Sequence, residues 1–129
     1  MPIQRYNPSS SHPDRAAQAW IVLISAAMNR QTLTYLGLSQ LMYRRRAQGV
    51  LDKILDQVAV FCNEHGLPKL TTLAVGKSSG TPGRGIPVDR SRLDELREEV
   101  YAFDWFDVRP PTPEELRSFA HGMKAATVD

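Results

Sequence analysis

The sequence predicts a mainly α-helical domain with a small β element. Apolar residues recur at helical spacing over residues 14–28 and, most regularly, over residues 47–65. A short apolar, β-rich run follows at 70–75, and a glycine-rich stretch comes directly after it. At 129 residues with 42% hydrophobic content, the chain is long enough for about one domain with one core.

The first helix is expected to begin beside Ser11, whose hydroxyl can cap it, with Pro13 in the first turn. After a break, Thr32 or Thr34 is expected to cap a short second helix that runs through Met42. The first helix would bury one apolar face, made of Ala16, Trp20, Leu23, Ile24 and Ala27.

The periodicity of residues 47–65 predicts a third helix that stops at Gly66, a common helix C-terminal residue. Residues 70–75 are expected to form a strand, and the run 76–85 a turn or β-wing that returns at Ile86. This order of elements predicts a winged helix-turn-helix. In the third helix, we expect Ala47, Val50, Leu51, Ile54, Leu55, Val58, Phe61 and Cys62 to face inward, and Gln48, Asp52, Lys53, Asp56 and Gln57 to face outward.

The rest of the chain is expected to form a helical appendage on the same core. It would hold a charged helix at about 91–102, a short strand or extended segment at 101–108, and a last helix that Thr112 caps. The predicted organisation is a flexible arm (1–12), a single domain (13–123, with core 13–86 and appendage 87–123) and a flexible tail (124–129).

Several function classes are disfavoured by composition. No apolar run approaches the ~20 residues that span a bilayer, and no signal-peptide pattern is present, so we expect no membrane partner and a cytoplasmic location. The single cysteine, Cys62, lies on an apolar helix face, and the three histidines are scattered. The glycine-rich run lacks the GK[ST] ending of a phosphate-binding loop. We therefore expect a non-enzyme with no catalytic residues, no metal and no cofactor.

Charge is distributed unevenly along the chain. Residues 1–86 hold ten Lys/Arg against four Asp/Glu, whereas residues 87–129 hold six against ten. This asymmetry favours an anionic partner for the first part, although mutual attraction between opposite faces of one protein explains it equally well.

Three consecutive arginines, Arg44-Arg45-Arg46, precede the third helix, where the helix macrodipole disfavours positive charge. In a helix-turn-helix, the start of the second helix enters the major groove. These arginines, with Gln48 and Lys53, are therefore expected near phosphates or base edges. The alternative is a solvated turn whose arginines pair with the acidic C-terminal half.

Thr34-Tyr35, then Leu38-Ser39 and Arg46-Ala47-Gln48-Gly49 resemble the TY-x-x-LA … RAVG signature in the DNA-binding domain of alkylguanine-DNA alkyltransferases and alkyltransferase-like proteins. The resemblance covers about residues 32–86 and implies that Tyr35 and Arg46 hold or replace a rotated nucleotide in the minor groove. Leu70-Thr71-Thr72 stands where that family has its reactive cysteine and histidine, which implies that alkyl transfer is absent. The predicted strand and loop, Leu67-Pro68-x-Leu70-Thr71 … Gly80-x-Pro82-Gly83-x-Gly85, are also similar to small bacterial and mobile-element proteins, a likeness that implies no activity.

The sequence thus favours a non-catalytic accessory or regulatory protein that binds nucleic acid, with DNA preferred over RNA. The alternative is a protein-interaction module, or an inhibitor of a nucleic-acid-handling machine, that docks through its basic face or through Phe103, Trp105 and Phe106, unless these aromatics pack in the core. The predicted nucleic-acid-binding residues are Tyr35, Arg44, Arg45, Arg46, Gln48 and Lys53, with Lys77, Ser78, Ser79 and Arg84 on the wing.

Overall fold

The computed structural model describes residues 3–76 and 90–117 and is mainly helical, with one small parallel sheet. No helix in these two ranges is long and apolar enough to cross a membrane. In chain order the elements are α1 (His12–Met28), β1 (Leu33–Thr34), α2 (Tyr35–Tyr43), α3 (Gln48–Glu64), the 3₁₀ turn η1 (Leu70–Leu73), β2 (Ala74–Val75), the 3₁₀ turn η2 (Arg90–Arg92), α4 (Leu93–Ala102) and the 3₁₀ turn η3 (Trp105–Asp107).

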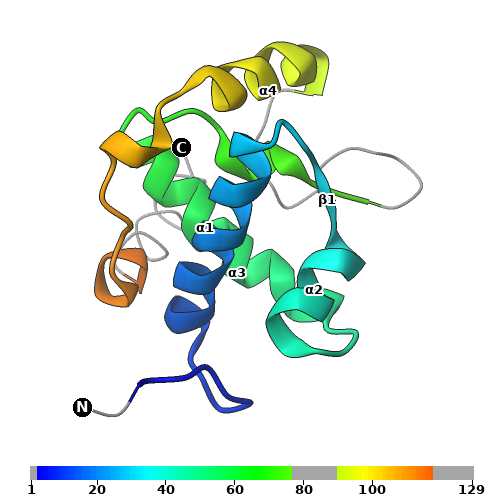
Figure 1. Ribbon diagram of the computed structural model, residues 1–129, viewed down its shortest axis with the longest axis vertical. Helices are drawn as coiled ribbons and strands as arrows, with labels where there is room; N and C mark the ends of the chain where they lie inside the picture. The colour runs from blue at the N-terminus through cyan, green and yellow to red at the C-terminus, as the bar shows by residue number, and fades with distance from the viewer. Residues whose placement is uncertain (1–2, 77–89, 118–129) are drawn as a thin grey trace, which may run out of the picture.

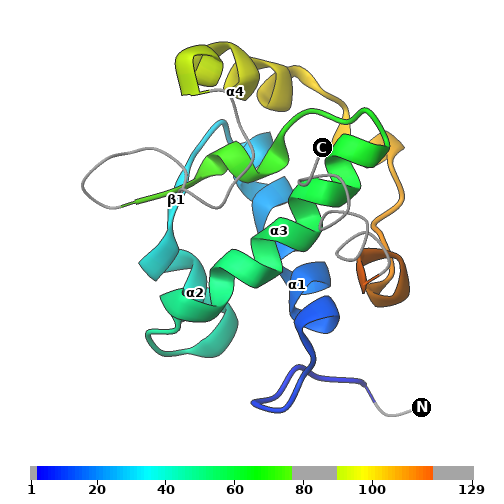
Figure 2. The ribbon, with the colours of Figure 1, turned by 180° about the vertical axis from the view of Figure 1, so that it is seen from behind.

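The two longest helices, α1 and α3, cross at the centre of the molecule, as Figures 1 and 2 show from opposite sides. The helix α4 lies at one end and the N-terminal arm at the other, with α2 nearer to the arm (Figure 1). Trp20 of α1 makes edge-to-face contacts with Phe61 of α3, at 5.5 Å between ring centroids, and with Trp105, at 5.7 Å. These buried rings join the appendage to the central pair of helices.

The predicted caps of α1 and α2 are confirmed. Ser11 Oγ accepts a hydrogen bond from the Asp14 amide at 3.3 Å, and Thr34 Oγ1 accepts one from the Gly37 amide at 3.0 Å. These side chains satisfy amides that a helix start leaves without an intrahelical acceptor. Gly66 follows α3 with φ of +66°, a left-handed conformation that suits a residue without Cβ.

The described side chains of α3 mostly follow the predicted faces, but Asp56, expected outside, is half-buried. Val50, expected inside, is 37% exposed, while Gln57, expected outside, is only 8% exposed. Val50 lies in the first turn of the helix, and α3 as a whole contacts α1, α2 and η1. The periodicity of the sequence predicts which face of α3 is buried, but it does not predict how wide that buried face is.

The strand prediction for residues 70–75 is wrong over its first four residues, which form η1, and right for Ala74 and Val75. The Thr72 hydroxyl donates to the Lys69 carbonyl at 2.8 Å, a local bond that competes with strand pairing. β2 pairs in parallel with β1, in the register Leu33 with Ala74 and Thr34 with Val75. Apart from Gly76, the predicted wing at 76–85 and the return strand at Ile86 lie outside the described residues.

The predicted strand or extended segment at 101–108 is wrong. The helix α4 continues to Ala102, and Asp104 then caps η3 by accepting a hydrogen bond from the Phe106 amide at 3.1 Å. Trp105 is 2% exposed, and its indole N–H donates to the Val100 carbonyl at 2.8 Å. Trp105 therefore packs in the core and cannot line the proposed protein-binding patch, where Phe106 is 79% exposed and Phe103 is half-buried.

The last predicted helix begins as expected at residue 113. Thr112 Oγ1 accepts from the Glu115 amide at 3.2 Å, and Glu115 Oε1 accepts from the Thr112 amide at 3.1 Å, so the two residues form a reciprocal capping box. Residues 113–117 are helical, and Leu116 is fully buried. The remainder of this helix to residue 123 and the tail at 124–129 lie outside the described residues.

Candidate nucleic-acid interface

The arginine triplet forms the turn between α2 and α3. Arg44 ends α2 in the left-handed conformation, with φ of 63° and its amide donating to the Gln40 carbonyl at 3.0 Å. An L-residue in this conformation is disfavoured by about 1 kcal/mol or more, and glycine or asparagine is the usual choice there. Ala47 precedes α3 and makes no side-chain capping bond. Because Arg44 is in the left-handed conformation, glycine at position 44 would make the backbone of this turn more stable.

All three side chains of the turn, those of Arg44, Arg45 and Arg46, are exposed. None of them forms an ion pair with a described residue. Where both partners are described residues, ion pairs join Arg30 to Glu98 and Arg92 to Glu95. Both involve the α4 end of the molecule, so the described acidic side chains of the C-terminal half do not neutralise the turn.

A fourth arginine, Arg15, lies beside the turn and is only 4% exposed. Its Nη1 donates to the Met42 carbonyl at 2.7 Å and to Gln18 Oε1 at 2.8 Å. Its Nη2 donates to the Asn7 carbonyl at 2.9 Å, while Nε is buried without a hydrogen-bond partner. The guanidinium thus ties the N-terminal arm to α1 and to the end of α2, and no described carboxylate forms an ion pair with it.

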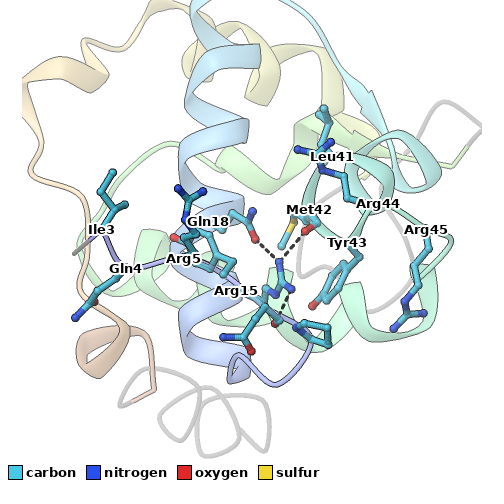
Figure 3. A pocket seen from close by; sticks show the side chains of 13 residues that line it. Ile3, Gln4, Arg5, Arg15, Gln18, Leu41, Met42, Tyr43, Arg44 and Arg45 are labelled. Atoms are coloured by element: carbon cyan, nitrogen blue, oxygen red, sulfur yellow. Dashed lines mark hydrogen bonds between the residues drawn. The ribbon is translucent and has the colours of Figure 1, made fainter.

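Aromatic rings flank this guanidinium. The Arg15 Cζ atom lies 4.2 Å from the centre of the Tyr43 ring and 5.6 Å from that of Tyr6. Arg45 Cζ lies 5.9 Å from the Tyr43 ring, and Figure 3 shows Tyr43 between the two arginines. Burial raises the pKa of Tyr43, and the nearby charges of Arg15 and Arg45 lower it in part. The net shift is upward, so Tyr43 stays a neutral phenol at physiological pH.

The arm, α1 and the end of α2 enclose a surface pocket of about 590 Å³ (Figure 3). Its lining includes Arg5, Arg15, Arg44 and Arg45, and the described residues that line it include no Asp or Glu. Sequence reasoning singled out the turn but missed Arg15. The available signal was a charged residue four positions before Ala19 and eight before Leu23, on the apolar stripe of the first helix.

Of the other predicted site residues, Tyr35, Arg46 and Lys53 do not line this pocket. Tyr35 is the first residue of α2, is half-buried and packs against the core. Gln48 is the first residue of α3, and Lys53 is exposed on that helix beside the exposed Asp52. Outside the described residues lie Lys77, Ser78, Ser79 and Arg84.

Two features bear on catalytic chemistry. Cys62 is fully buried, and this burial raises the pKa of its thiol to about 12, which keeps it protonated and inert at physiological pH. Among the residues that the structure describes, no three His, Cys, Asp or Glu side chains are grouped so as to hold a metal ion.

Comparison with protein-family models, with curated proteins and with solved structures finds no match to this chain. The likeness to the alkyltransferase-like DNA-binding domain therefore stays a prediction that depends on Tyr35, Arg46 and the residues around them.

Proposed function

We propose that this protein is a non-catalytic accessory or regulatory factor that binds nucleic acid, with duplex DNA as the preferred partner. One observation carries the proposal: three exposed arginines occupy one turn, and no described carboxylate neutralises them. Arg15 and Arg5 add positive charge on the same side of the molecule. Side chains of this kind bind phosphates by displacing condensed counterions, which makes binding strongly salt-dependent.

The element order supports a helix-turn-helix role for this surface. The helices α2 and α3 flank the arginine turn, and β1 and β2 pair beside them. In such motifs the start of the second helix enters the major groove, which would bring Gln48 and Lys53 toward the bases. In a winged helix-turn-helix, residues 76–85 would form the wing and lie along the sugar-phosphate backbone of the DNA.

The backbone conformation of Arg44 lowers the stability of the folded protein. Arg44 is held in the left-handed conformation, where glycine would be more stable, and its side chain makes no hydrogen bond to a described residue. A strained residue often makes a contact that offsets the strain, as Arg30, the other described non-glycine residue with positive φ, does in its ion pair with Glu98. We infer that the Arg44 side chain is retained for a contact with the partner.

The direct test is binding of labelled duplex DNA across a salt series by the wild-type protein and by Arg44→Ala/Arg45→Ala/Arg46→Ala. Each lost phosphate contact should reduce the slope of log K against log salt by about one. The matched control is Arg30→Ala, because Arg30 is also an exposed arginine but pairs with Glu98 at the α4 end. The proposal fails if the triple variant and the wild-type protein bind with the same affinity and salt slope.

A second candidate function is docking to another protein. Ile21 and Leu41 are 59% and 56% exposed and line a separate pocket of about 300 Å³ between α1 and α2. Large exposed apolar side chains that adjoin one another are typical of interaction surfaces. A stable protein complex that Ile21→Asp abolishes, together with no binding to any duplex or single strand at low salt, would favour this function over the first.

A further inference from the structure

The pocket of about 590 Å³ is built differently from the exposed arginine turn beside it. Its walls come from the N-terminal arm, from α1 and from the end of α2, and it contains four arginines from these three segments. A loose array of surface cations would bind any polyanion. A concave site lined by arginines from separate segments can bind one kind of anionic group in preference to others.

Arg15 gives the pocket a permanent positive charge. It is held by two carbonyl oxygens and one amide oxygen, all of them neutral, and it is 4% exposed. A buried charge without an opposite charge is costly, because the hydrogen bonds to neutral groups do not replace the lost solvation in full. An anion bound in the pocket would compensate for this charge, and Arg5, Arg44 and Arg45 would share in holding it.

The pocket is suited to a phosphate monoester. A monoester carries about −1.5 to −2 charge at neutral pH, against −1 for an internal phosphodiester, so it gains more from a pocket lined by several arginines. The pocket volume is within the range of about 300–1,000 Å³ that is usual for small-molecule sites, so it also admits the nucleoside that carries the phosphate. Tyr6, which is 43% exposed on the pocket wall, offers a ring for base stacking.

We propose that this pocket binds a nucleotide through a terminal phosphate monoester, with Arg5, Arg15, Arg44 and Arg45 as the cationic side chains and Tyr6 as the stacking ring. The inference rests on the proposed function in its main form, in which the nucleotide is the phosphorylated end of a nucleic-acid strand. A free mononucleotide offers the same chemistry and is the second source to be tested.

The experiment compares one labelled oligonucleotide with and without a 5′-phosphate, and a second pair with and without a 3′-phosphate, by fluorescence anisotropy. The phosphorylated strand of one pair should bind about fivefold to tenfold more tightly, as expected for added charge-assisted hydrogen bonds. Arg5→Ala should remove this preference, because Arg5 lines the pocket but lies outside the turn. Arg46→Ala is the matched control: this exposed arginine does not line the pocket, so its loss should weaken all strands and preserve the ratio.

The free-nucleotide source is tested by the melting temperature of the full chain with a nucleoside 5′-monophosphate or with the unphosphorylated nucleoside. The inference is supported if the monophosphate raises the melting temperature of the wild-type protein, the unphosphorylated nucleoside does not, and Arg5→Ala shows no rise with either. This result would support nucleotide binding in the pocket even if no oligonucleotide binds. Equal affinities within both oligonucleotide pairs and no rise with the monophosphate would overturn the inference. If Arg46→Ala still weakens strand binding in that case, the proposed function stands without the pocket. A phosphoserine peptide that raises the melting temperature as much as the mononucleotide does would overturn the nucleotide assignment.

Discussion

Replacing Arg44 by glycine should stabilise the fold and weaken binding at the same time. Arg44 ends α2 with φ of 63°, and its amide hydrogen bond to the Gln40 carbonyl does not depend on the side chain. Glycine adopts this conformation without the Cβ clash that an L-residue suffers. Relief of about 1–2 kcal/mol of strain is offset in part by the greater freedom of glycine in the unfolded chain, which costs about 0.5–1 kcal/mol. We therefore expect a net gain of about 0.5–1 kcal/mol.

Two measurements check this prediction. Thermal unfolding should show a rise of about 2–5 °C in melting temperature for a domain of this size. Duplex binding across a salt series should show a lower affinity and a slope reduced by about one, because one phosphate contact is lost. The melting temperature should rise while the affinity for DNA falls. This combination is informative, because a general loss of structure would lower both.

The matched control is Arg30→Gly. Arg30 is the other described non-glycine residue with positive φ, at 53°, and it lies at the end of α1 beside α4. The change relieves similar strain but removes the exposed ion pair to Glu98, worth about 0–1 kcal/mol, so the net gain should be smaller. Binding should not change. The reasoning is refuted if Arg44→Gly lowers the melting temperature, or if it leaves the salt slope at the wild-type value.

The remaining predictions concern the core and two titratable groups. Burial, and secondarily the charge of Asp52, raises the pKa of Asp56, so the ionised carboxylate costs stability at neutral pH and that cost disappears as the pH falls through the folded-state pKa. Asp56→Asn should therefore increase the free energy of unfolding in urea at pH 7 by less than about 1 kcal/mol, because water screens the half-exposed group, and the gain should fade as the pH is lowered; a gain that grows on acidification would contradict this. The Cys62 thiol should not react with a disulfide reagent at about pH 8 until the protein is denatured, because burial raises its pKa to about 12, and rapid labelling of the native protein would show an open site. Trp105→Ala should cost about 3–5 kcal/mol in urea unfolding, while Phe106→Ala, which removes a ring that is 79% exposed, should stay within about 0.5 kcal/mol; similar losses in both would mean that Trp105 is not the anchor.

Local rules account well for the helices. Ser11, Thr34 and Thr112 cap helices as predicted, and Gly66 follows α3 in the expected conformation. A cap bond joins residues three positions apart, and a buried stripe needs only its own periodicity, so both can be read from neighbouring residues.

The small sheet could not be read in the same way. β1 and β2 have two residues each and pair across about forty positions of chain, so neither shows an alternating pattern of its own. At Leu70–Leu73 a side-chain hydrogen bond from Thr72 and the packing of α4 on η1 outweigh β propensity. Trp105 likewise belongs to the core because Trp20 lies beside it, and no local pattern contains that contact.

For the candidate site, the sequence by itself determined that three arginines lie in one turn before the longest helix, because helix limits are set by local spacing and caps. Only the tertiary structure decided what surrounds them. Arg15 comes 29 positions before Arg44 in the numbering, yet the crossing of α1 with α3 and the fold of the arm place it at the end of α2, against Tyr43 and under Asn7. The charge of a residue is a property of the sequence, but whether it is neutralised depends on which groups the fold brings near it. Here the described residues that line the pocket of about 590 Å³ include further arginines and no carboxylate.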